Sequence, residues 1–192
     1  KKKKKFDKSI TGGSDGTRWS HFKLAEAIPN PLFEDAIIKI LDMRKEDFTE
    51  IVEGKKFVNG ITGGPAIEEM LKKVNVQKDL KNLTQKLKTR KRKERDKVYK
   101  RVKILRALDE SGQDPTVYMM RSVPVLPPHF RPVTVKENGD LSSNDLNGLY
   151  KDVGAVSETF TMQKDLDLPD DFLQKQRKSL YNGVKAIIFF FF

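Results

Sequence analysis

Apolar residues recur at steps of three and four positions in two separate stretches of the chain, which is the spacing of one face of an α-helix. The first stretch has Val76, Leu80, Leu83 and Leu87, then Val98, Val102, Leu105 and Leu108. The second has Leu146, Leu149, Val153, Val156 and Phe160, then Phe172, Leu173, Leu180 and Tyr181. A short polar turn divides each stretch, so the pattern predicts two antiparallel helical hairpins whose apolar faces meet. Asn182 and Gly183 are expected to end the second hairpin.

Between these two stretches lies a segment that cannot be helical. Residues 123–132 contain four prolines, which break helices and supply no backbone donor, so we expect a stiff, extended strap. A short strand is expected at 133–135, and Asn138 and Gly139 favour a tight reversal within 137–140. Ser143 or Asn144 can then cap the next helix. The segment therefore predicts a loop that projects between the strap and a helix.

The first 62 residues predict smaller elements. Residues 18–24 suggest a short strand, 27–31 a turn, and Asn30 a cap for a helix that begins at Pro31. A second short helix is expected at 47–52 and a brief strand at 55–58. The predicted fold class is thus mainly α with short β strands (α+β), with two antiparallel helical hairpins joined by a proline-rich extended strap and a loop. Four segments are expected: 1–62, 63–112, 113–142 and 143–192.

Charge separates the two predicted hairpins. The chain has 38 Lys and Arg against 27 Asp and Glu, a formal net charge of +11. Residues 72–106 carry 16 basic and 3 acidic residues, whereas residues 137–171 carry 9 acidic and 2 basic ones. Clustered positive charge favours phosphate contact through counterion release, although a solvated helix face accounts for it equally well. The strongest basic run is Arg90, Lys91, Arg92 and Lys93.

The sequence holds no recognisable catalytic or metal-binding constellation. It has no cysteine and only two histidines, His21 and His129, which lie far apart, so we expect no metal site. Neither a phosphate-binding Gly-rich loop nor a serine with a His–carboxylate partner is present. No run of 18 apolar residues predicts a membrane span. The apolar residues 186–192 are expected to dock onto a partner or to lead into further chain.

The strap and the sequence after it carry a family resemblance. The motif V-P-V-L-P-P-H-F-R-P at 123–132, followed by N-G-D-L-S-S-N-D-L-N-G-L-Y at 138–150, closely resembles the β′ subunit of bacterial-type multisubunit DNA-directed RNA polymerase. The R-W-S-H-F-K-L run at 18–24 and Leu41-Asp42-Met43 resemble earlier motifs of the same family. The cysteines of the zinc ribbon found in cellular β′ chains are missing. This suggests a divergent, phage-type enzyme or a trimmed piece.

The resemblance implies a non-catalytic N-terminal clamp part of β′. The four segments would then be an N-terminal clamp segment, a basic helical hairpin, a strap with the lid loop, and a clamp-helix coiled coil. Such a part would hold the template DNA/RNA hybrid, separate the RNA with the lid at 136–141, and dock a sigma-like initiation factor. Its partners would be other polymerase subunits, DNA and nascent RNA, without a membrane, in the cytoplasm. The chain itself would need no cofactor, and magnesium is expected only in the assembled enzyme.

The resemblance also implies which residues make these contacts. Nucleic acid would meet the lid and the basic hairpin through Arg131, Lys136, Glu137, Asn138 and Gly139 and through Arg90, Lys91, Arg92 and Lys93. The initiation factor would meet Asn147, Tyr150, Lys151, Asp152, Val156, Glu158 and Thr159. The family usually has an Arg- and Asn-rich run after the tyrosine, and this chain lacks it. We therefore expect a dedicated, more basic factor.

A different class of function is also consistent with the basic run. A free-standing helical adaptor could bind nucleic acid through residues 72–106 without belonging to any polymerase. A subunit gene should continue past Phe192 to an aspartate triad that holds magnesium, whereas an adaptor gene should not.

Overall fold

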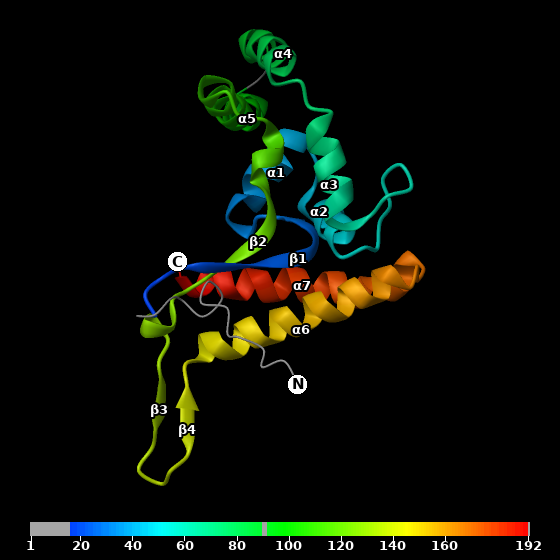
Figure 1. Cartoon of the computed structure of the whole chain (residues 1–192). Coiled ribbons are helices and arrows are strands. Elements are labelled where there is room, and N and C mark those ends of the chain that lie inside the picture. Colours follow the sequence, from blue (N-terminus) through cyan, green and yellow to red (C-terminus); the bar gives the residue numbers. More distant parts are fainter. Residues whose placement is uncertain (1–15, 90–91, 192) are drawn as a thin grey trace. The chain divides into compact units, whose positions relative to one another are not determined.

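The computed structural model describes residues 16–89 and 92–191 (Figure 1). The fold is mainly helical, with small two-stranded sheets. The helices are α1 (Glu34–Leu41), α2 (Lys45–Val52), α3 (Gly63–Lys72), α4 (Val76–Thr89), α5 (Arg92–Ser111), α6 (Asp145–Asp165) and α7 (Asp170–Phe191). The strands are β1 (Ser20–Pro29), β2 (Met119–Val125), β3 (Val133–Val135) and β4 (Leu141–Ser143). The 3-10 turns are η1 (Pro31–Phe33), η2 (Pro115–Tyr118) and η3 (Pro128–Phe130).

The chain divides into two compact units. The hairpin unit comprises Lys1–Ala25 and Arg121–Phe192, and the basic unit comprises Glu26–Met120. Strands β1 and β2 pair in a two-stranded sheet, and both cross the boundary between the units. None of the helices in the described ranges is long and apolar enough to cross a membrane.

In the basic unit, α1, α2 and α3 surround a small apolar core. Its fully buried side chains are Ile37, Ile40, Phe48, Ile51, Ile67 and Leu71. The Asn30 side chain accepts a hydrogen bond from the Leu32 backbone N–H, as expected of a cap. Gly64, the second residue of α3, lies directly against β1, since a Cβ at that position would stand 1.7 Å from the Ala27 carbonyl oxygen. This glycine lets the helix approach the strand backbone.

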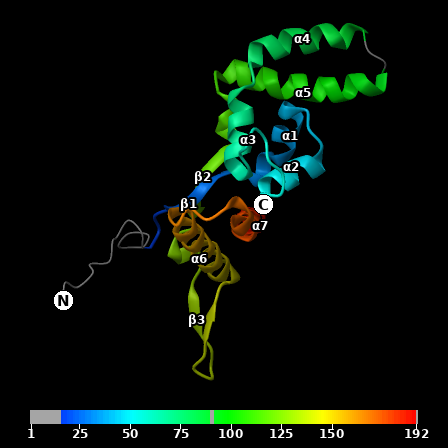
Figure 2. The same ribbon diagram turned by 90° about the vertical axis from the view of Figure 1, so that its right-hand side faces the viewer.

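Helices α4 and α5 pack against each other as an antiparallel pair, seen most clearly in Figure 2. The apolar stripe predicted on α5 is buried, and Leu83 is the buried member of the stripe on α4. Helix α5 also packs on α1. The pair is thus attached to the core of the basic unit mainly through α5.

Helices α6 and α7 form the second antiparallel pair (Figure 1). On α7, the buried positions recur at alternating steps of four and three residues, which is a heptad spacing. The buried residues are Leu146, Val153, Ser157 and Phe160 on α6 and Leu173, Arg177, Leu180, Tyr181, Val184, Ile187 and Ile188 on α7. Phe172, expected in this core, is instead 68% exposed.

The expected end of the second helix at Asn182 and Gly183 was wrong, because α7 continues to Phe191. Gly183 lies in the interface with α6, where a Cβ would come within 2.5 Å of a Val153 methyl group. The residue therefore permits close helix packing and does not stop the helix. Ile187 and Ile188 of the terminal apolar run are buried, whereas Phe189 and Phe190 are half exposed.

Three other local expectations also need correction. The predicted turn at 27–31 is wrong, since β1 runs to Pro29 and only the turn η1 follows. The strand expected at 55–58 reduces to an isolated bridge between Val58 and Ile61. The strap is a strand in its first part and a 3-10 turn in its second. Pro124 is accommodated in β2 because a two-stranded sheet leaves one edge of each strand unpaired.

Candidate functional site

The loop predicted at 136–141 is the tip of a β-hairpin formed by β3 and β4 (Figure 1). Val133 pairs with Ser143, Thr134 with Ser142 and Val135 with Leu141. The turn closes itself: the Lys136 N–H donates to the Asp140 carbonyl at 2.8 Å, and the Gly139 N–H donates back to the Lys136 carbonyl at 2.9 Å. Gly139 has a φ of 82°, which glycine adopts without strain. The tip is therefore a defined and exposed turn.

Polar side chains complete this turn. The Asn138 side chain donates to the Asp140 carboxylate at 2.6 Å and accepts from the Asp140 backbone N–H at 3.1 Å. All residues from Pro132 to Asp140 are exposed, including the apolar Val133 and Val135. A two-stranded hairpin with both faces in water has little packing of its own, so its position depends on how its base is held.

The base of the hairpin is held by Arg131 and Asn147. The Arg131 guanidinium donates to the Leu126 carbonyl at 2.7 Å and to the Asn147 side-chain oxygen at 2.5 Å. The Asn147 amide donates back to the Arg131 carbonyl at 3.2 Å. These bonds tie the chain just before β3 to the first turn of α6. Asn144 caps that turn by accepting from the Leu146 N–H at 2.9 Å.

Tyr150 lies beside this cluster on the next turn of α6. Its hydroxyl accepts from the Leu126 N–H at 3.0 Å and donates to the Pro124 carbonyl at 3.1 Å. The Arg131 guanidinium lies 5.5 Å from the centre of the tyrosine ring, and Phe22 of β1 meets the ring edge-on at 6.4 Å. Burial raises the pKa of the Tyr150 hydroxyl, against smaller lowering effects of the Leu126 bond and Arg131. The phenol thus stays neutral and can donate.

A shallow groove of about 200 Å³ runs between α6 and α7. Val156 and Thr159, both expected to dock a factor, line it together with Ala155, Lys175, Gln176 and Ser179. Lys151, Asp152 and Glu158 are exposed on α6. The groove has an apolar floor, and the exposed charged side chains of the two helices have both signs, Asp152 and Glu158 as well as Lys151 and Lys175.

The basic helix pair divides its cations between two tasks. Lys97 pairs with Asp42 at 3.1 Å, and Arg101 reaches both Asp42 at 3.3 Å and Asp79 at 3.6 Å, which fixes α5 to α1 and α4. Other basic side chains face solvent, namely Lys78, Lys81, Lys86, Arg95, Lys100, Lys103 and Arg106. Of the run Arg90, Lys91, Arg92 and Lys93, the first two residues lie outside the described ranges. Arg92 and Lys93 begin α5, and their side chains lie outside the described part of the structure.

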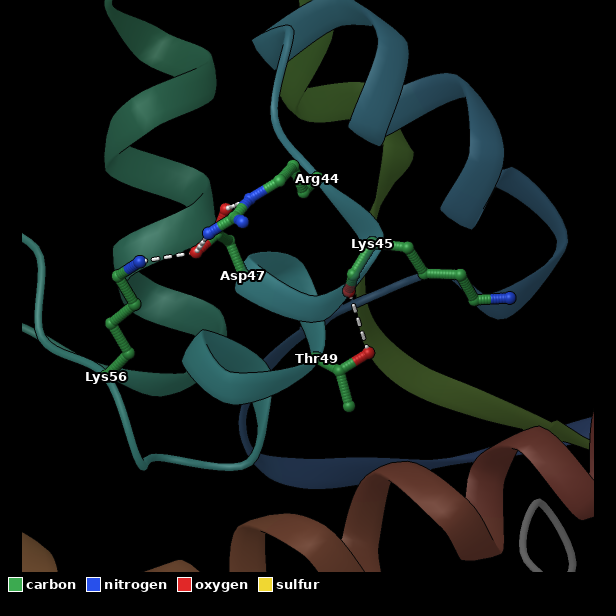
Figure 3. Close-up of polar contacts among 5 residues, drawn as sticks. All are labelled: Arg44, Lys45, Asp47, Thr49 and Lys56. Carbon is green, nitrogen blue, oxygen red and sulfur yellow. Dashed lines mark hydrogen bonds and ion pairs between the residues drawn. The ribbon is translucent and has the colours of Figure 1, made fainter.

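A further ion-pair network sits at the start of α2 (Figure 3). Asp47 accepts from Arg44 at 2.8 Å and from Lys56 at 2.5 Å, which brings the chain after α2 back to its first turn. These two hydrogen bonds hold the pKa of the Asp47 carboxyl well below its usual range. The Thr49 hydroxyl donates to the Lys45 carbonyl at 3.0 Å on the same helix. The network is a structural brace, not a reactive group.

The described ranges contain no cluster of three His, Cys, Asp or Glu side chains that could hold a metal ion. The carboxylates near the α6–α7 turn are used locally: Asp170 pairs with Arg177 at 2.8 Å, and Asp171 accepts from Gln174 at 3.3 Å. The arrangement therefore offers binding surfaces and a projecting hairpin.

Sequence comparison agrees with this geometry. Residues 13–188 match the family described as RNA polymerase Rpb1, domain 1. The chain belongs to this family. Similar proteins include the DNA-directed RNA polymerase subunit beta' of Lactobacillus acidophilus, 36% identical over 126 residues, which are 66% of this chain and 10% of that one. The same subunit of Acholeplasma laidlawii is 29% identical over 147 residues, 76% of this chain and 11% of that one.

The corresponding subunit of Geobacillus kaustophilus is 31% identical over 126 residues. The chain spans about a tenth of the length of the curated relatives it matches. What it shares with them is therefore one domain of a much larger subunit.

Within this Rpb1 domain 1 family member, the predicted site residues fall into separate groups. Arg131, Asn147 and Tyr150, expected to serve two different partners, contact one another. The hairpin tip stands apart from them, and Val156 and Thr159 line the groove farther along α6. Sequence reasoning missed Leu126 and Phe22 as partners of the cluster, and Lys175, Gln176 and Ser179 as the other wall of the groove. The heptad spacing on α7 could have revealed that wall.

Proposed function

We propose that this chain is a non-catalytic clamp part of a β′-like subunit of DNA-directed RNA polymerase. The family match over residues 13–188 carries this proposal. It is supported by an exposed hairpin anchored at the start of the α6–α7 pair, in which α6 carries more acidic than basic residues, and by a second, basic helix pair. The proposed partners are other polymerase subunits, DNA, nascent RNA and a sigma-like initiation factor. Magnesium would act in the assembled enzyme through residues outside this chain.

The β3–β4 hairpin is proposed to act as a lid that separates RNA from the template. Its turn holds its shape through bonds among Lys136, Asn138, Gly139 and Asp140, so it needs no ligand to be ordered. A wedge must keep its shape when strands press on it, and its tip must be accessible. Both conditions are met by an exposed turn on an anchored base.

The lid role can be tested by shortening the hairpin in the assembled enzyme. Replacement of residues 136–140 by two glycines should leave RNA annealed to the template beyond its normal hybrid length. Nuclease mapping of the hybrid on a preformed scaffold would measure this. A variant with Asn182 replaced by alanine, at an exposed position of α7, keeps the hairpin and serves as the control. Normal displacement of RNA by the shortened hairpin would contradict the lid role.

The α6–α7 pair is proposed to dock the initiation factor. Asp152 and Glu158 are exposed on α6, and Val156 and Thr159 line the groove, so a partner would meet apolar contacts in the groove and carboxylates on α6. Like charge disfavours duplex DNA on this surface and favours a basic protein. A factor with a basic helix fits these requirements better than a nucleic acid.

The basic helix pair is proposed to add affinity for nucleic acid without sequence preference. Replacement of Arg90, Lys91, Arg92 and Lys93 by glutamine should reduce the slope of log affinity against log salt by about 0.9 for each residue that meets a phosphate. An unchanged slope would mean that these cations do not meet a phosphate and form only a solvated charge run. A free-standing adaptor would show the same loss, so copurification of β-type and β′-type subunits with the chain from its native source separates the two functions.

A further inference from the structure

We propose that Arg131 is a positioning residue that sets the direction of the β3–β4 hairpin on α6, and that it does not bind phosphate. The proposal deepens the lid role and rests on it for its functional meaning, but the positioning itself is a property of this chain. It reassigns a side chain that its sequence context suggested was a nucleic-acid contact.

Two of the five N–H donors of the Arg131 guanidinium are bonded within the chain. Its Nε donates to the Leu126 carbonyl and one terminal nitrogen donates to Asn147, while its guanidinium lies against the Tyr150 ring. The side chain is half-buried, whereas the residues that follow it up to the hairpin tip are exposed. A guanidinium held in this way stands at the base of the hairpin, with its plane fixed by two acceptors and a ring.

The pair of hydrogen bonds between Arg131 and Asn147 fixes the direction in which the β3–β4 hairpin leaves α6. Asn147 accepts from the Arg131 side chain and donates to the Arg131 backbone carbonyl, so both parts of Arg131 are fixed to α6. Tyr150 adds two bonds to the strap at Pro124 and Leu126, which hold the chain on the other side of the turn η3. The hairpin thus starts from a segment that is bound to two successive turns of one helix.

This geometry requires arginine. A lysine at position 131 would keep the positive charge but is a single point donor, and it cannot bond two acceptors in one plane while stacking on a ring. A phosphate contact would tolerate this change, because lysine also binds phosphate as a point charge. Arg131→Lys therefore separates positioning from phosphate binding.

The experiment measures hairpin direction in the chain itself. The sequence has no cysteine, so spin labels can be placed at Asn138→Cys on the tip and Glu158→Cys on α6 without a background signal. The distance distribution between the labels should be narrow in the parent chain. It should broaden in Arg131→Ala and Arg131→Lys and, to a smaller degree, in Tyr150→Phe, which retains the ring. Arg18→Ala, at an exposed arginine of the same unit, is the matched control.

Binding to a nucleic-acid scaffold supplies the second measurement. If Arg131 only positions the hairpin, the salt slope of binding stays the same in Arg131→Ala. If Arg131 binds phosphate, the slope falls by about 0.7–0.9 and Arg131→Lys restores it. A narrow, unshifted distribution in Arg131→Lys would overturn the proposal, whether or not the hairpin acts as a lid. A broadened distribution with normal RNA displacement would leave positioning intact and count against the lid role alone.

Discussion

The two helix pairs of this chain share an architecture but differ in charge and in how they are held. The α6–α7 pair is closed by apolar residues at heptad spacing and by the close approach of Gly183 to Val153. The α4–α5 pair buries a thinner stripe and is joined to α1 by Lys97, Arg101 and Asp42. Helical patterning thus determines that each pair forms, whereas surface charge bears on which partner each can meet.

The difference also separates two kinds of stability. Burial of apolar surface is little affected by salt, whereas ion pairs at the surface weaken as salt screens them. The stability of the α6–α7 pair should therefore depend on side-chain shape, and that of the α4–α5 pair partly on ionic conditions. The changes below test this contrast, beginning with the largest expected effect.

Phe160→Ala should cause the largest loss. Phe160 is fully buried in the α6–α7 pair and lies under Arg177, with the guanidinium 5.7 Å from its ring centre. Truncation of a buried phenylalanine lowers the free energy of unfolding by about 3–5 kcal/mol. Urea denaturation followed by circular dichroism measures it. Phe172→Ala, at an exposed phenylalanine of the same pair, should stay within about 0.5 kcal/mol. Equal effects of both changes would mean that the pair is not packed as described.

Gly183→Ala and Gly154→Ala should have opposite signs. A Cβ at Gly183 meets Val153 at 2.5 Å, and the stiff valine cannot move aside, so overpacking should cost about 1–3 kcal/mol. Gly154 has nothing within 4 Å of such an atom, so alanine there should stabilise α6 by about 0.5–1 kcal/mol. Thermal unfolding of both variants provides the measurement. Destabilisation by both would point to a different contact face on α6.

Asp47→Asn should make the free energy of unfolding of the basic unit less dependent on pH in the acidic range. Because its ion pairs lower the pKa of Asp47 in the folded chain, they stabilise the fold above the usual carboxyl pKa, and this contribution is lost as the pH falls through the lowered value. The gap between parent and variant should be full at neutral pH and narrow below about pH 4. Denaturant titrations at several pH values would measure it. A gap that does not change with pH would exclude this role.

Asp42→Asn should have the smallest effect. Asp42 accepts from Lys97 and Arg101 but is half exposed, and asparagine tolerates its positive φ of 51°. The expected loss is at most about 1 kcal/mol at low salt and should disappear at high salt. Parallel unfolding curves at both salt concentrations give the answer. A loss that persists at high salt would mean that the basic pair is not held electrostatically.

The sequence predicted the elements with strong periodicity and missed those set by tertiary contacts. The α5 stripe from Val98 to Leu108 and the cap at Asn30 were confirmed, because they follow from local spacing and local hydrogen bonds. On α4, only Leu83 of the predicted stripe is buried. The predicted end of α7 was wrong because a glycine after a helical stretch is a local signal for a helix end. The contact that explains Gly183 is made with Val153 on another helix, α6. β2 was missed because prolines argue against a strand until its partner strand is known.

The candidate site divides in the same way. The tip residues Asn138 and Gly139 indicated the turn directly, since their backbone preferences are local. The cluster of Arg131, Asn147 and Tyr150 could not be predicted, because the bonds that join α6 to the strap connect positions 16 to 26 residues apart. Only one wall of the groove was predicted. The sequence indicated Val156 and Thr159 on α6, whereas the opposite wall depends on how α7 packs.

The central proposal is that the α6 face with Asp152 and Glu158 receives a basic initiation factor, while the basic pair does not. The direct test is Asp152→Arg with Glu158→Arg in the assembled enzyme, compared with Asp109→Arg and Glu110→Arg, the same charge change on α5. Promoter-dependent initiation and extension of a preformed scaffold are measured side by side. The first variant should lose initiation and keep extension, and the second should keep initiation. Equal loss in both assays, or no loss of initiation, would contradict factor docking on α6–α7.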